Sequence, residues 1–84
     1  MAYYVYILHS EKDGSYYIGH TADLDERIQR HNLGKSSYTK AKVPWKLVYR
    51  EVFTTRSEAT KREKEIKHMK SREYVEQLVT ASRV

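Results

Sequence analysis

Residues 2–20, AYYVYILHSEKDGSYYIGH, decide the fold, because two aromatic-rich apolar runs flank a short charged turn. Residues 2–9 are β-branched and aromatic and predict a strand, and residues 15–20 predict a return strand. Between them, Glu11-Lys12-Asp13-Gly14 contains the Asp-Gly pair that is typical of a hairpin turn. The chain therefore begins with two antiparallel strands.

Tyr6 and Tyr17 are predicted to lie on one face of this hairpin. A two-residue turn at Asp13-Gly14 sets Tyr6 opposite Thr21, with Tyr17 four residues along on the same face. The two tyrosines are then about 13 Å apart at about 3.3 Å per residue, and a shifted or bulged turn brings them closer. The spacing predicts a shared face and leaves a shared site open.

Cap residues mark the helix that follows the hairpin. Thr21 or Asp23 caps this helix, which runs to about Asn32, and Gly34 suits the position just after its end. A polar loop over residues 35–44 then leads to the next element. These signals predict one helix directly after the second strand.

The second half of the chain predicts one more strand and two helices. Residues 45–53, WKLVYREVF, alternate loosely and form the third strand, and Thr55-Arg56-Ser57-Glu58 has the spacing of a capping box. The helix that follows extends to His68 or Lys70, and Ser71 caps a last short helix. The order β-β-α-β-α-α predicts a small α/β fold in which helices pack on a partly antiparallel sheet.

Composition limits the kind of protein. The chain has 84 residues, which predicts a single domain over residues 1–84, and the absence of cysteine excludes a disulfide scaffold and a thiolate zinc site. The opening MAYYVYILHS lacks the basic start of a secretory signal, and no run approaches the roughly 20 apolar residues that cross a bilayer. We therefore expect a soluble protein of the cytoplasm.

Positive charge is concentrated in the middle of the chain. The net charge is +5, and residues 35–72 hold twelve basic and four acidic residues, whereas residues 1–34 carry a net charge of −2. In KSSYTKAKVPWK, the rings of Tyr38 and Trp45 interleave with the lysines Lys35, Lys40, Lys42 and Lys46. Cations neutralise phosphates while rings stack on bases, so this segment favours nucleic-acid binding, with a solvated lysine surface as the equal alternative.

Polar residues are predicted on the inward faces of two helices. Leu24, Arg27, Ile28 and His31 share one face of the first helix, which carries a cation and an imidazole toward the sheet and suggests an anionic partner. A structural alternative pairs Arg27 with Asp23 and leaves His31 as a packing residue. Tyrosine supplies eight of the ten aromatic residues, so hydroxyl-bearing rings are available beside these groups.

Glu63 lies on the inward face of the second long helix, with Ala59 and Ile66 at helical spacing. A carboxylate in that place needs a cation, either a metal ion or an arginine. The structural alternative is an ion pair with Arg27 or Arg62. Spacing alone favours the ion pair and leaves Glu63 as a candidate metal ligand.

Taken together, these residues resemble the GIY-YIG nuclease domain, and above all its small single-domain bacterial members. The segments that carry the resemblance stand in the expected order: YYVYIL, DGSYYIGHT, DLDERIQRHN, PWKLVY and SEATKREKEIK. The domain is also similar to the N-terminal nuclease domain of the excision-repair incision enzyme. The family fold, a three-stranded antiparallel sheet flanked by helices, agrees with the predicted order of elements.

The resemblance implies roles for the residues of the hairpin and the first helix. Tyr6 ends the first motif, in which Tyr4-Val5 replaces Gly-Ile, and it accepts the proton of the attacking water with help from nearby positive charge. Tyr17 orients water or phosphate, and Gly19 permits close approach. Arg27 binds the scissile phosphate.

The resemblance also implies a metal and a substrate. His31 occupies a position where members carry His or Tyr, Glu63 holds one divalent cation, Mg²⁺ or Mn²⁺, and His20 stands where the incision enzyme has a lysine near the phosphate. Residues 69–78, MKSREYVEQL, lack the asparagine that many members carry there. Lys40, Lys42 and Lys46 are candidate substrate contacts.

The sequence therefore predicts a metal-dependent endonuclease that hydrolyses DNA, in particular structured or damaged DNA, with a place in DNA repair. DNA is favoured over RNA. One alternative is a nucleic-acid-binding module with weak or no catalysis. Another is a nuclease subunit whose protein partner supplies target specificity, because 84 residues leave no room for a second recognition domain.

Overall fold

The computed structural model describes residues 1–82, so the last two residues of the predicted domain lie outside the described residues. The strands are β1 (Tyr3–Ser10), β2 (Tyr16–Thr21) and β3 (Trp45–Phe53), and the helices are α1 (Leu24–Asn32), α2 (Arg56–His68) and α3 (Arg72–Ala81). The predicted order β-β-α-β-α-α is confirmed. A single 3₁₀ turn, η1 (Lys40–Lys42), interrupts the predicted loop.

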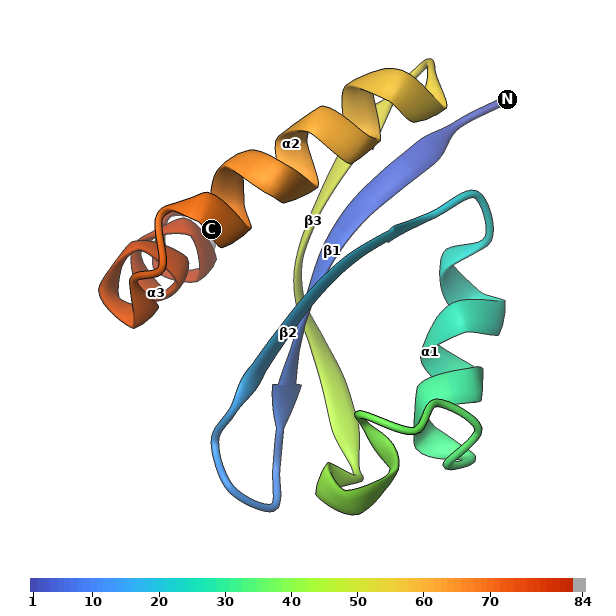
Figure 1. The fold of residues 1–84 in the computed structure, drawn as a ribbon, viewed down its shortest axis with the longest axis vertical. Coiled ribbons are helices and arrows are strands. Elements are labelled where there is room, and N and C mark those ends of the chain that lie inside the picture. Colours follow the sequence, from blue (N-terminus) through green and yellow to red (C-terminus); the bar gives the residue numbers. More distant parts are fainter. Residues whose placement is uncertain (83–84) are drawn as a thin grey trace.

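The three strands form one antiparallel sheet in the order β2-β1-β3, which confirms the predicted fold class. Helix α1 covers one face of the sheet, and α2 and α3 cover the other (Figure 1). Strand β1 lies in the centre and alternates between the two faces. Its residues Val5 and Ile7 pack toward α2 and α3, whereas Tyr6 and Leu8 pack toward α1.

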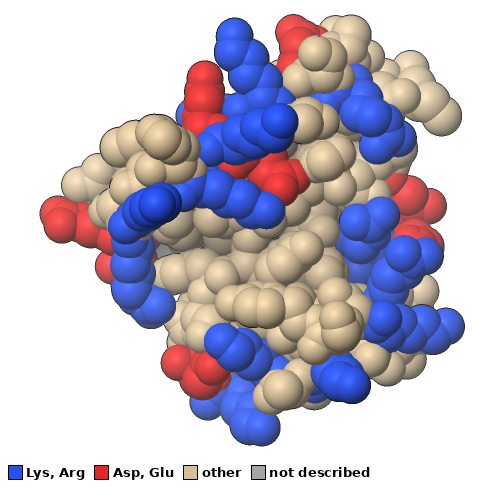
Figure 2. Space-filling view, in the orientation of Figure 1, with Lys and Arg blue, Asp and Glu red and all other residues tan. Residues whose placement is uncertain are grey.

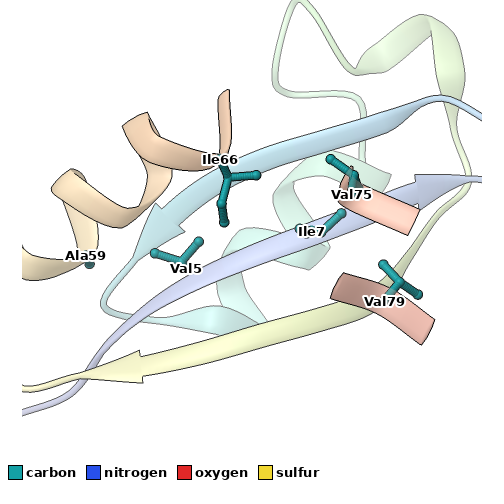
Figure 3. Close-up of a cluster of buried hydrophobic side chains, with 6 residues drawn as sticks. All are labelled: Val5, Ile7, Ala59, Ile66, Val75 and Val79. Atoms are coloured by element: carbon teal, nitrogen blue, oxygen red, sulfur yellow. The ribbon is translucent and has the colours of Figure 1, made fainter. Parts of the chain in front are cut away.

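The larger apolar core lies between the sheet and the helices α2 and α3. Ala59 and Ile66 of α2 and Val75 and Val79 of α3 join the two β1 residues of that face (Figure 3). On the opposite face, Tyr6 and Leu8 pack with Leu24 and Trp45. This second core includes the aromatic side chains of Tyr6 and Trp45, whose polar atoms are therefore held in place by the packing of their rings.

The register of the hairpin differs from the predicted one. Tyr6 pairs with Gly19 instead of Thr21, and Leu8 pairs with Tyr17. The turn is longer than two residues, because the Ser10 N–H donates to the Ser15 carbonyl at 2.8 Å across a four-residue loop. A two-residue shift keeps every side chain on its face, so the predicted shared face holds and the two tyrosines come closer together.

The predicted helix ends are confirmed. Asp23 caps α1 by accepting from the Glu26 N–H, and Thr55 and Glu58 form a reciprocal capping box at the start of α2. Gly34, at φ +76°, follows the end of α1 in the left-handed conformation that glycine favours. Among residues 1–82, no helix has the length and apolar character that a membrane crossing requires.

Candidate functional site

Gly19 makes room for two tyrosines on the α1 side of the sheet. A β-carbon at this position would lie 2.6 Å from the Tyr6 hydroxyl oxygen and 3.2 Å from Cε2 of Tyr17. Contacts this short force a shift of the neighbours, so a glycine is required beneath the Tyr6 ring. The ring centroids of Tyr6 and Tyr17 are 6.2 Å apart. The structure therefore brings the two predicted tyrosines together.

His31 connects Tyr6 to the loop before β3. Its Nε2 lies 3.1 Å from the Tyr6 hydroxyl oxygen, and its Nδ1 lies 2.9 Å from Oγ1 of Thr39. The Thr39 hydroxyl donates to the Ser36 carbonyl at 3.5 Å, so we assign the Nδ1 proton to His31 and let its Nε2 accept the Tyr6 proton. All three side chains of this chain of hydrogen bonds are buried.

Thr39 is a residue that the sequence analysis missed. It lies in the polar loop over residues 35–44, where no periodic pattern marks a buried position. Its carbonyl accepts from the indole Nε1 of Trp45 at 2.9 Å. Trp45 could have indicated it, because a buried indole N–H needs a hydrogen-bond acceptor and the loop before Trp45 is the nearest segment that can supply one.

The electrostatics of this cluster keep Tyr6 and His31 neutral. Burial raises the pKa of Tyr6 to about 12, with Tyr17 adding to the effect and the Arg27 guanidinium opposing it. Burial lowers the pKa of His31 below its ordinary 6.5, and the charges of Arg27 and Arg30 lower it further. Arg27 acts to lower the pKa of Tyr6, as expected of nearby positive charge, but desolvation of the buried phenol outweighs the arginine and the net change is upward.

The pKa of His31 predicts a loss of stability in mild acid. The unfolded chain takes up the proton first as the pH falls, so the free energy of unfolding decreases below pH 6.5. Urea unfolding between about pH 7.5 and 5 measures this slope. His31→Gln is the comparison, because the three other histidines remain in both proteins. We expect a flatter curve for the variant, and parallel curves would contradict the assignment.

Tyr17 is the tyrosine of the pair that reaches the surface. Tyr6 has no exposed surface, whereas Tyr17 is half-buried and lines a groove on the β2 side of the molecule. The Tyr17 ring lies 4.8 Å from the His31 ring and 6.0 Å from the ring of Tyr38, measured between centroids. Of the two predicted tyrosines, Tyr17 is therefore the one that can touch a bound molecule in this conformation.

Arg27 carries a buried polar atom that the protein does not satisfy. Its Nε is inaccessible to solvent and has no hydrogen-bond partner among residues 1–82. The ion pair with Asp23 that the sequence also allowed does not satisfy it. A buried donor without an acceptor is unfavourable. Arg27 is half-buried and forms no ion pair with residues 1–82, so its charge is left to a ligand such as a phosphate. Arg27 is close enough to Tyr6 and His31 to lower the pKa of both.

Glu63 pairs with His20 and Lys67 at the edge of strand β2. The His20 Nδ1 lies 2.5 Å from Glu63 Oε1, and the Lys67 Nζ lies 2.5 Å from Oε2. The alternative ion pairs with Arg27 or Arg62 are wrong: Arg62 binds Glu51. Burial acts to raise the pKa of Glu63, but hydrogen bonds from Lys67 and His20 hold that pKa below its ordinary value.

The predicted site residues fall into two groups that meet across β2. Tyr6, Tyr17, Arg27 and His31 gather on the α1 side, and the Glu63–His20 pair approaches from α2. The Glu63 charge also contributes to raising the pKa of Tyr6, so the two groups interact.

The predicted lysine contacts lie outside this cluster. Lys40 and Lys46 are exposed, while Lys42 pairs with Asp13 at 3.6 Å and lies 5.5 Å from the centre of the Tyr38 ring. Figure 2 shows Lys and Arg side chains along α2 and α3 on one side and along α1 on the other, with a mostly uncharged surface over β2 between them. That surface, framed by cations, suits an extended anion.

The donor set around Glu63 fits a magnesium or manganese ion only in part. Among residues 1–82, no group of three or more His, Asp or Glu side chains could hold a metal ion. Mg²⁺ is commonly bound through one or two carboxylates, with water and substrate phosphates as its other ligands. Glu63 can supply that carboxylate once Lys67 moves from Oε2, and half of the Lys67 side chain is exposed. A single-carboxylate site completed by substrate is therefore compatible with these residues.

Comparison with known proteins finds similarity along most of the chain. Residues 2–75 match the GIY-YIG catalytic domain family. A UPF0213 protein of Halalkalibacterium halodurans is 47% identical over 81 residues, which cover 95% of this chain and 84% of the relative. A UPF0213 protein of Staphylococcus saprophyticus is 52% identical over 66 residues, which cover 77% of this chain and 79% of that protein.

A solved structure agrees with the fold. The solution NMR structure of a UPF0213 protein from Bacillus halodurans has a TM-score of 0.63 and 44% sequence identity, and the match covers 98% of this chain and 86% of that chain. The family match at residues 2–75 includes every residue of the cluster and the Glu63–His20 pair.

Proposed function

The chain belongs to the GIY-YIG catalytic domain family, a family of nucleases, and from this premise we propose that it is a divalent-metal-dependent endonuclease that hydrolyses DNA. The observation that carries the proposal is the half-buried Arg27, which lies beside the tyrosine–histidine cluster and forms no ion pair with residues 1–82. A cation that no carboxylate of the described residues neutralises is available to bind an anion. The scissile phosphate of a nucleic acid supplies that anion.

Arg27 binds and orients this phosphate. Its planar guanidinium offers several donors, and the forked geometry matches two oxygens of a phosphate. Charge on these oxygens grows as the attacking water approaches, so a fixed cation stabilises the transition state more than the ground state. The packing of Tyr6 and His31 keeps the cluster beside Arg27 rigid.

Tyr17 contacts the attacking water, and Tyr6 acts as a positioning residue. The Tyr17 ring reaches the surface, whereas Tyr6 is buried and bonded to His31. Water forms a new bond to phosphorus as the bond from phosphorus to the 3′ oxygen breaks. The proton lost by water moves to the Tyr17 oxygen as the Tyr17 hydroxyl passes its own proton to solvent, and solvent protonates the leaving oxygen. The products are a 5′ phosphate and a 3′ hydroxyl.

Glu63 would hold the divalent cation, with His20 orienting the carboxylate through Oε1. When bound, the ion supplies positive charge to the phosphate oxygens and to the leaving oxygen. His20 donates to the carboxylate through Nδ1, which fixes the direction in which Glu63 presents its second oxygen. In this structure the Lys67 ammonium pairs with that second oxygen and supplies the positive charge that the divalent ion would supply when bound.

The proposal is tested by incubating the protein with plasmid, branched and single-stranded DNA in Mg²⁺ or Mn²⁺. We expect nicked or shortened products, complete loss of cleavage in EDTA, and recovery when Mn²⁺ is added in excess. EDTA removes the ion that the proposal assigns to Glu63, and excess Mn²⁺ replaces it. Gel analysis of the products is the measurement. Cleavage that continues in EDTA would overturn the metal requirement, and binding without any product would overturn the endonuclease.

The two tyrosines are expected to respond differently to loss of the hydroxyl. Tyr17→Phe lowers the single-turnover cleavage rate about 10²-fold, because a contact with the attacking water is lost, and it leaves stability unchanged. Tyr6→Phe removes a buried hydrogen bond to His31 and lowers the free energy of unfolding by about 1 kcal/mol. Quenched-flow rates and urea unfolding of both variants measure this contrast. An inactive Tyr6→Phe beside an active Tyr17→Phe would reverse the assignment.

One observation favours a second function, binding of nucleic acid without cleavage. Oε1 of Glu63 is bonded to the His20 imidazole and Oε2 to the Lys67 ammonium, so the carboxylate is satisfied without a metal. A binding module predicts salt-sensitive affinity for DNA and no product in the cleavage experiment. A nuclease subunit that depends on a protein partner for its target predicts cleavage with little preference among DNA forms.

A further inference from the structure

A groove of about 550 Å³ runs beside the candidate site, between strand β2 and the junction of α2 with α3. Tyr17 forms part of its wall, and so does Lys67, the partner of Glu63. The groove therefore adjoins the candidate site through Tyr17 and Lys67. Its volume lies within the range of sites that hold ligands of nucleotide size.

Exposed aromatic surface forms one wall of this groove. Tyr38 is 62% exposed, so its ring is not used to fill either apolar core. Its ring lies 6.0 Å from that of Tyr17, and Lys42 Nζ lies 5.5 Å from the centre of the Tyr38 ring. Beside these two neighbours most of Tyr38 stays open to solvent, which leaves ring surface on which a base can stack.

Basic side chains form the opposite wall. Lys67, Lys70 and Arg72 line the groove, and none of its lining residues within the described chain is acidic. Arg72 also lies over the Tyr16 ring, 4.8 Å from its centre. Rings on one side and cations on the other match a nucleotide, whose base is flat and whose phosphate is anionic.

Lys70 occupies a backbone conformation that lysine rarely adopts. Its φ is +48°, in the left-handed region that favours glycine, directly after the end of α2. Glycine would form this turn with less strain. A lysine at this position places its cation in the groove, which gives a physical reason for the unfavourable residue.

We propose that this groove binds about one or two unpaired nucleotides of a DNA strand next to the bond that is cut, with a base on Tyr38 and phosphates on Lys70 and Arg72. The location relative to the cut rests on the proposed function, and the binding itself does not. Continuous duplex is disfavoured, because its bases are stacked on one another and present no face to Tyr38. The preferred substrate is therefore DNA with a single-stranded segment.

The test measures binding in EDTA, without cleavage, by fluorescence anisotropy of labelled oligo(dT) and of a duplex of equal length. We expect tighter binding of the single strand. Tyr38→Ala weakens oligo(dT) binding about tenfold and leaves duplex binding unchanged, while Tyr38→Phe keeps the stacking surface and the affinity. Lys70→Gly retains the turn and lowers the slope of affinity against salt by about 0.7.

Lys61→Ala is the matched control, because it removes one exposed lysine from α2 outside the groove and is expected to leave the single-strand preference intact. Equal affinity of Tyr38→Ala and the original protein for oligo(dT) would overturn the proposal, as would tighter binding of oligo(U) than of oligo(dT). Tyr38-dependent binding by a protein that cuts no DNA would overturn only the endonuclease. Cleavage by a protein whose binding ignores Tyr38 would overturn only the groove.

Discussion

Replacing Glu63 by glutamine is expected to lower the single-turnover cleavage rate about 10³-fold in Mg²⁺. The amide has the shape of the carboxylate and lacks its charge, so a divalent ion loses its protein ligand and the transition state loses several kcal/mol of charge stabilisation. Stability changes little by comparison, because the amide oxygen of glutamine can still accept from His20 and the Lys67 side chain is half-exposed, so water can solvate its ammonium. Rates measured over a range of Mn²⁺ concentrations show whether the loss lies in metal binding.

Glu65→Gln is the matched control for this prediction. Glu65 lies two residues along the same helix, is exposed, and pairs only with Arg62 among residues 1–82. The same change of charge at this position is expected to leave the cleavage rate unaltered. Equal rates for Glu63→Gln and Glu65→Gln would remove Glu63 from the reaction and favour the binding module.

The hairpin shows how far the sequence determines the site. Alternation of apolar and polar residues correctly places Tyr6 and Tyr17 on one face, because side chains alternate strictly along a strand. The distance between them depends on the loop, and Ser10 decides the loop: its hydroxyl accepts the N–H groups of Lys12 and Asp13 and supports a four-residue turn. A serine at a strand end gives no pattern that distinguishes this turn from an Asp-Gly turn.

The spacing of residues along a helix likewise predicts which side chains face the sheet, but it does not predict which residues they contact there. Arg27, His31 and Glu63 all lie toward the sheet, as their spacing indicates. The Lys67 partner of Glu63 is four residues along the same helix, so it was accessible to sequence reasoning. His20 and Thr39 reach their partners only through the packing of separate elements. Long-range pairs of this kind leave no local signal in one sequence.

Arg27→Met is expected to lower the cleavage rate about 10²–10³-fold and, at the same time, to raise the free energy of unfolding by about 1 kcal/mol. Cleavage falls because the phosphate loses a fixed cation. Stability rises because a buried Nε without a partner is replaced by an apolar chain of similar length. Opposite signs for activity and stability are typical of a residue kept for a ligand, and cleavage rates with urea unfolding measure both.

Arg30→Met separates this effect from a general loss of positive charge. Arg30 lies on the same helix, is exposed, and pairs with Glu26, so its removal is expected to change stability by less than about 0.5 kcal/mol and to leave cleavage intact. Arg27 also lowers the pKa of His31, so its replacement is expected to raise that pKa, which NMR titration of the imidazole measures. A destabilised Arg27→Met that still cleaves DNA would make Arg27 a structural residue, since a side chain kept for packing contributes to folding and not to the rate.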